Sequence, residues 1–133
     1  MSTPSARNDG SQNVHFLRKR VTFGMNGSTI TVGKLPAGAS VVGGGAHVVT
    51  AFNDSGTDTL IVGFVGSTTD DNAYATLLDL SAVGYIALDE LAATTNIQGT
   101  VEHTVTCVYA GQNSNATAGI ADVIVMYVPS NDS

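Results

Sequence analysis

The chain has 133 residues, a length that suits one domain, and its eleven acidic and five basic residues give a net charge of −6. Only 12% of the residues are charged, against roughly 25% in a typical soluble domain, which favours a molecule that packs against neighbours. The single cysteine excludes an intrachain disulfide. No apolar run is long enough to span a membrane, and the polar start of the chain predicts no secretion signal.

The charges are unevenly distributed along the chain. Every basic residue lies at or before Lys34, whereas the residues after it include ten acids and no base. This distribution predicts a flexible basic N-terminal arm, residues 1–20, joined to an acidic domain, residues 21–133. Because an acidic body repels nucleic acid, we expect no nucleic-acid partner.

The first quarter of the chain is expected to be extended. Residues 1–13 are polar and predict disorder, and residues 15–23 favour a first strand or an extended arm. Asn26 and Gly27 are typical of a tight hairpin, in which both residues take positive φ angles. Alternating apolar and polar residues then predict a strand at 28–34.

The middle of the chain is expected to contain strands and one helical segment. Gly43–Gly45 predicts a loop or a strongly bulged strand. Strands are predicted at 46–52 and 57–65, and the turn residues Asn53–Gly56 between them predict a hairpin. Capping residues and apolar residues near helical spacing predict one or two helical turns within 70–80.

The last third of the chain is dominated by two apolar strands. A short strand is predicted at 85–90 and a loop at 91–99, followed by strands at 99–110 and 118–128. About eight short strands with regular turns and little helix indicate an all-β fold, a jelly-roll-like antiparallel β-sandwich with one short helical segment and an extended N-terminal arm. The final strand is apolar enough to be central in its sheet.

The residues that could support nucleophilic catalysis are too far apart. Cys107 and His103 point to one face of a strand but lie about 13 Å apart along it. A Cys–His pair therefore cannot form, and a buried apolar cysteine is expected.

The candidate metal ligands also lack a suitable spacing. His15, His47 and His103 do not include the closely spaced pair that a cupin would need. The four aspartates that cluster in turns match no calcium-binding loop: Asp54, Asp58, Asp70 and Asp71. We therefore expect no enzyme, no metal site and no cofactor.

Three adjacent bases, Arg18, Lys19 and Arg20, are the strongest candidate for a binding function. On an extended segment Arg18 and Arg20 face one way and Lys19 the other. Two interpretations stay open: a solvated strand edge that blocks aggregation, or an arm that docks on an acidic neighbour.

Three segments between Lys34 and Val128 carry a recognisable pattern: "KLPAGASVVGGGAHVVTAFNDSGTDTLIVG", the Asp-rich "DDNAYA" followed by "LDL", and the final strand "TAGIADVIVMYV". Through these segments, most of the chain resembles small head proteins of tailed bacteriophages. This resemblance implies a capsid decoration, or cement, protein with a jelly-roll fold.

Such a protein would be made in the bacterial host cytoplasm and would bind the outer surface of the virion. The resemblance implies that it associates with itself as a dimer or trimer and bridges subunits of the major capsid protein, with no membrane partner. Arg18, Lys19 and Arg20 lie outside the matched region, so their docking on acidic capsid surface is a hypothesis from charge alone.

Two other functions compete with this one. A receptor- or carbohydrate-binding jelly-roll module of a phage fibre or head spike would use exposed aromatic residues. The chain has no tryptophan, and its four tyrosines lie in patterns that the core could claim. A cupin-like enzyme would need a stoichiometric transition metal.

Overall fold

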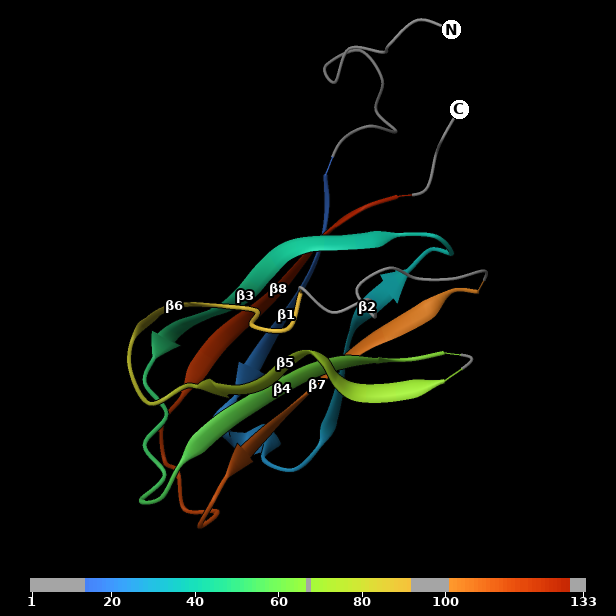
Figure 1. Cartoon of the computed structure of the whole chain (residues 1–133). Helices are drawn as coiled ribbons and strands as arrows, with labels where there is room; N and C mark the ends of the chain where they lie inside the picture. Colours follow the sequence, from blue (N-terminus) through green and yellow to red (C-terminus); the bar gives the residue numbers. More distant parts are fainter. Residues whose placement is uncertain (1–13, 67, 92–100, 130–133) are drawn as a thin grey trace, which may run out of the picture.

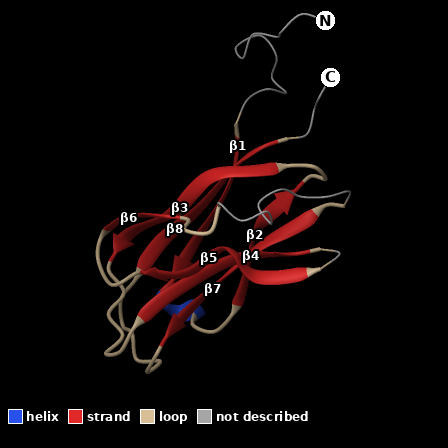
Figure 2. Cartoon of the chain, in the orientation of Figure 1, coloured by secondary structure: helices blue, strands red, loops and turns tan. Residues whose placement is uncertain are grey.

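The computed structural model describes residues 14–66, 68–91 and 101–129. These residues form eight strands and one short 3-10 helix, shown in chain order in Figure 1 and by type in Figure 2. The elements are β1 (His15–Thr22), η2 (Phe23–Met25), β2 (Thr29–Leu35), β3 (Ser40–Thr50), β4 (Asp58–Val65), β5 (Thr69–Asp79), β6 (Gly84–Ala87), β7 (His103–Gly111) and β8 (Ile120–Val128).

The strands build two four-stranded antiparallel sheets. One sheet has the order β1-β8-β3-β6, and the other has the order β2-β7-β4-β5. Within the sheets β1 pairs with β8, β2 with β7, β3 with β6 and β4 with β5. This nested pairing of early with late strands is the arrangement of an eight-stranded jelly roll. The predicted all-β sandwich is confirmed, and β8 is central as expected.

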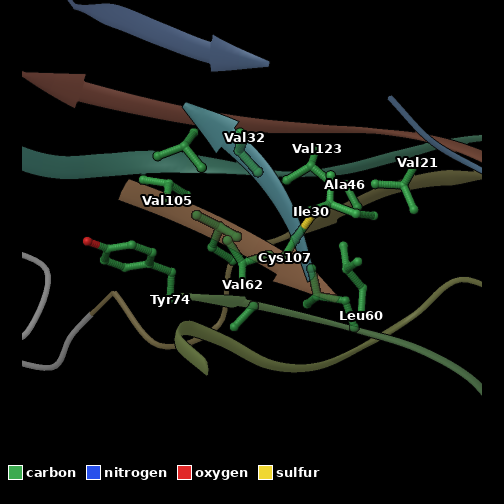
Figure 3. Close-up of a cluster of buried hydrophobic side chains, with 14 of the residues drawn as sticks. Val21, Ile30, Val32, Ala46, Leu60, Val62, Tyr74, Val105, Cys107 and Val123 are labelled. Carbon is green, nitrogen blue, oxygen red and sulfur yellow. The ribbon is translucent and has the colours of Figure 1, made fainter. Parts of the chain in front are cut away.

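The core lies between the two sheets and is made of alternate residues of the strands. Cys107 and Val62 project from one sheet, and Ala46 and Val123 project from the other, as Figure 3 shows. All four are fully buried. Period-two alternation explains this, because successive side chains of a strand point to opposite faces.

The helical turns predicted within 70–80 were wrong, because this segment is strand β5. Its pairing with β4 shifts register twice, between Leu60 and Val62 and between Val62 and Phe64. Such irregularities interrupt the alternation of side chains, so that three consecutive residues, Ala73–Ala75, are buried. The interrupted pattern mimics helical spacing in the sequence. The helical segment that is present is η2.

The sandwich begins before the expected boundary at residue 20. Residues 15–22 form β1, and each of them is in register with a residue of β8. Val21 is fully buried, and Leu17 packs against the core close to Gly33 of β2, so the apolar residues of β1 hold it on the sheet. Residues 1–13, for which disorder was predicted, lie outside the described residues.

Two predicted hairpins are instead connections between the sheets. Asn26 and Gly27 lie between β1 and β2, which belong to different sheets, and only Gly27 has a positive φ (Asn26 −55°, Gly27 +77°). Asn53–Gly56 likewise joins β3 of one sheet to β4 of the other. For Gly43–Gly45 a loop or a strongly bulged strand was predicted. These glycines lie within strand β3 in regular register with β8, and the register shifts immediately before them, between Val41 and Gly43. The loop predicted at 91–99 lies almost entirely outside the described residues.

Candidate interaction surface

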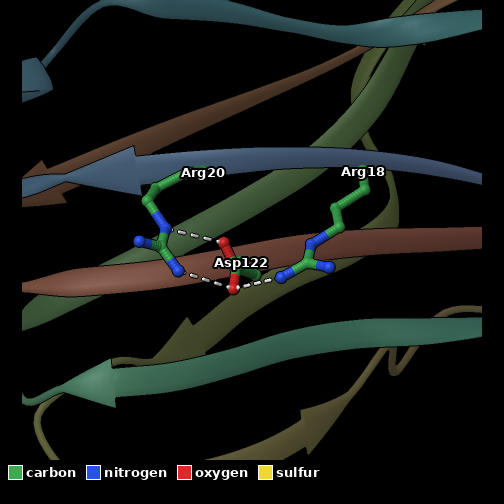
Figure 4. Close-up of polar contacts among 3 residues, drawn as sticks. All are labelled: Arg18, Arg20 and Asp122. Atoms are coloured by element: carbon green, nitrogen blue, oxygen red, sulfur yellow. Dashed lines mark hydrogen bonds and ion pairs between the residues drawn. The ribbon is translucent and has the colours of Figure 1, made fainter.

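Strand β1 places its two arginines on the outer face of the sheet, where they share one carboxylate. Arg20 lies directly opposite Asp122 of β8, and Arg18 lies two residues earlier. Arg20 donates two hydrogen bonds to Asp122, of 3.0 and 3.1 Å, and Arg18 donates one of 2.9 Å. Figure 4 shows both guanidinium groups converging on this carboxylate. The expectation that Arg18 and Arg20 share a face is confirmed.

The three charges of this group do not cancel. Asp122 is nearly fully buried, while the side chains of Arg18 and Arg20 are 65% and 55% exposed. The hydrogen bonds from Arg20 lower the pKa of Asp122 to about 2, against the opposing effect of burial and with further help from Arg18. One carboxylate thus meets two guanidinium groups, and a net positive charge remains on the surface.

Replacing Asp122 should flatten the dependence of stability on acid pH. The ordinary pKa of 3.8 falls to about 2 on folding, so ionised Asp122 stabilises the fold above about pH 4, and this stabilisation is lost as the pH falls through 2. We expect Asp122→Asn to lower the free energy of unfolding near pH 7 by roughly 1 kcal/mol. Between pH 4 and pH 2 the variant should lose less stability than the wild type does. Melting temperatures measured across this range test the prediction, and parallel profiles would contradict it.

An open groove of about 340 Å³ lies beside the arginines, lined by Phe16, Arg18 and Ile124. Arg18 and Ile124 are register partners, and Phe16 lies on the same face of β1. The Phe16 side chain is 64% exposed. The groove therefore combines apolar side chains with the side chain of Arg18.

The residues expected to be unsuitable for catalysis are core residues. Cys107 is fully buried, as expected, and burial raises its pKa to about 12, so it is held as a thiol. His103 is buried, with its ring edge-on to Phe64 and its Nδ1 3.0 Å from the Val101 carbonyl oxygen. In the described part of the chain, no three His, Cys, Asp or Glu side chains are grouped to hold a metal ion.

Asp54 acts as a clamp between two loops, a role that the sequence reasoning missed. Its carboxylate accepts hydrogen bonds from the backbone N–H groups of Gly56, Asn113 and Asn115. Burial opposes ionisation of Asp54, but these N–H groups outweigh it and hold the pKa below its ordinary value. The clue in the sequence is that both connections, "NDSG" and "GQNSNAT", are rich in side chains that bond to backbone.

The tyrosines divide between the core and the surface. Tyr74 and Tyr109 are fully buried, and the Tyr109 hydroxyl donates a 2.6 Å hydrogen bond to Asp58, which is itself buried. Tyr85, which its sequence pattern would also have allowed in the core, is 57% exposed. Its strand, β6, is a short edge strand that presents it outward.

Comparison with solved structures finds the same fold in viral particles. The chain is similar to a chain of the acidic stable capsid structure of Helicobacter pylori bacteriophage KHP30, with a TM-score of 0.67, 21% identity and coverage of 89% of both chains. It is similar to a chain of the cyanophage Pam1 capsid asymmetric unit, with a TM-score of 0.68, 23% identity and coverage of 97% of this chain and 92% of that one. It is also similar to a chain of the capsid of Ralstonia phage GP4, with a TM-score of 0.67, 19% identity and coverage of 99% of this chain and 93% of that one.

The fold is shared with chains of three phage capsids. Because coverage is nearly equal in both directions, each matched chain is close to this one in length. A scan against protein-family models found no match, and a search of curated proteins gave none either. No helix within the described residues is long and apolar enough to cross a membrane.

Proposed function

We propose that the chain is a structural virion protein that binds the outside of a phage capsid and bridges subunits of the major capsid protein. The observation that carries the proposal is the match over nearly the whole chain to similarly sized chains in three phage capsids. The identities of 19–23% establish the fold alone. The proposed function is therefore supported further by the polar groups and the surface charges of the molecule.

The distribution of polar groups supports a protein that binds its neighbours without catalysing a reaction. The buried acids are used within the fold: Asp54 clamps two loops, Asp58 accepts from Tyr109, and Asp122 binds two arginines. No buried side-chain polar atom in the described residues is left without a hydrogen-bond partner. A fully satisfied interior favours a rigid building block whose functional surfaces are its outer faces.

In the proposed particle, Arg18, Lys19 and Arg20 meet an acidic protein surface from strand β1. The pairing of both arginines with Asp122 fixes their positions, which reduces the side-chain entropy lost on binding. Many copies on one shell would attach firmly even if each contact is weak, because each contact raises the effective concentration of the next.

The test uses heads of the phage that encodes the chain, prepared without it. We expect the purified chain to cosediment with these heads to a saturating ratio and to raise the temperature at which they release DNA. Lys19→Ala leaves the Asp122 pairs intact and should weaken binding at low salt, with Ala110→Ser, at an exposed position on β7, as the control. Absence of saturable binding at low and high salt would refute the proposal.

A further inference from the structure

The bases of the described residues gather on one edge of the sandwich. β1 and β2 are the outermost strands on one side of the two sheets, whereas β5 and β6 are the outermost strands on the other. The four bases on β1 and β2 form what we call the basic edge: Arg18, Lys19, Arg20 and Lys34. Asp122 and Glu102 neutralise this edge only in part, and the Lys34–Glu102 pair is exposed with a 3.7 Å separation.

The opposite edge carries five acids, which we call the acidic edge: Asp70, Asp71, Asp79, Asp89 and Glu90. Asp89 and Glu90 follow β6 and belong to this edge because both accept hydrogen bonds from Thr76 of β5. Asp79 accepts hydrogen bonds from the backbone N–H and the hydroxyl group of Ser81. Among the described residues, none of the five is paired with a base.

The most exposed large apolar side chains also lie at these two edges. Val83, which lies between β5 and β6, is 67% exposed, and Leu77 of β5 is 66% exposed. On the basic edge, Phe16 is 64% exposed and lines the groove with Arg18 and Ile124. The two edges are thus complementary in charge, and each offers apolar surface to a partner.

We propose that the basic edge of one copy binds the acidic edge of a second copy, whose apolar side chains enter the groove beside Arg18. The edges lie on opposite sides of the sandwich, so the contact is head to tail. The proposed assembly is a closed ring of three or more copies, because a head-to-tail contact that did not close would continue as a filament. The chain's own terminal segments, 1–13 and 130–133, are poor occupants, since Met1 is their only large apolar residue. This contact does not require the capsid. It identifies the acidic protein surface that Arg18, Lys19 and Arg20 meet as the edge of a neighbouring copy, and so goes beyond the proposed function.

The test exchanges charges between the edges. Lys19→Glu with Lys34→Glu makes both edges acidic, and Asp71→Lys with Asp89→Lys reduces the net charge of the acidic edge from −5 to −1. All four positions are exposed, so the fold should survive, and circular dichroism checks this. By sedimentation velocity at low salt, we expect the wild type to form a closed oligomer and each variant to self-associate at least about tenfold more weakly.

Mixing the two variants should restore a complex, because each then offers the edge that the other lacks. Ala110→Glu, on the interior strand β7 and opposite Thr59 of β4, changes no residue of either edge. It is the control for added negative charge and should assemble like the wild type. A monomeric wild type, a two-fold dimer, or variants that assemble normally would each overturn the proposal. Capsid binding by a monomer would retain the proposed function while excluding this contact, so the two failures are distinguishable.

Discussion

Tyr109→Ala is expected to destabilise the protein by about 3–5 kcal/mol, a large part of the roughly 5–15 kcal/mol that stabilises a typical domain. The Tyr109 side chain is fully buried, and its ring packs against Phe52 with centroids 4.7 Å apart. Its removal leaves a large cavity and also leaves the carboxylate of Asp58, which is only 2% exposed, without the hydroxyl that donates to it.

Two further variants separate these contributions. Tyr109→Phe keeps the ring and loses only the hydrogen bond to Asp58, so it should cost about 1–3 kcal/mol. Tyr85→Ala removes a tyrosine that is 57% exposed and should change stability by less than about 0.5 kcal/mol. Urea denaturation gives all three free energies of unfolding. An effect of Tyr109→Ala no larger than that of Tyr85→Ala would show that the core is not packed as described.

Gly44→Ala is the second large effect and should cost about 3–5 kcal/mol, because backbone strain and a steric clash add. Gly44 of β3 has a φ of +120°, a conformation that residues with a side chain rarely adopt. A Cβ atom there would also collide with the backbone carbonyl oxygen of Ile124 in the neighbouring strand β8. Either β3 or β8 must therefore move, in the middle of the sheet that carries the Arg18–Asp122 pair.

Gly84→Ala provides the matched control for this variant. Gly84 has a similar φ of +138°, but nothing lies within 4 Å of a Cβ built on it. Gly84→Ala should therefore introduce the backbone strain without the steric clash and lower the free energy of unfolding by about 1–3 kcal/mol. Thermal and urea unfolding of both variants test the difference. If the two substitutions cost the same, the close approach of β3 to β8 at Gly44 would be refuted.

The sequence could predict the fold class because short apolar runs are separated by turn residues at regular intervals, and in some strands the apolar residues alternate. In β7 the apolar residues Val105, Cys107 and Tyr109 recur at every second position, and all are buried. Alternation failed at β5, where two register shifts in the pairing with β4 expose Leu77 and bury Ala73–Ala75. Turn residues mark where a strand ends but not which sheet the next strand joins, so the two predicted hairpins were wrong.

Of the interaction surface, the sequence could predict only three adjacent basic residues, Arg18, Lys19 and Arg20. Alternation along a strand was enough to place Arg18 and Arg20 on one face. Their partner, Asp122, lies more than a hundred residues away, and only the register of β1 with β8 brings it between them. The gathering of acids at β5 and β6, opposite the bases, likewise depends on strand order, to which separation in sequence gives no guide.

The composition of purified virions tests the central claim most directly. Particles of the phage that encodes the chain can be banded by density, digested and quantified by mass spectrometry, with intact particles probed by an antibody against the chain. A structural role on the outer shell predicts many copies per particle, in a fixed ratio to the major capsid protein, and antibody binding to intact virions. A chain that is absent from pure particles, or present and accessible only after they are broken open, would contradict that role.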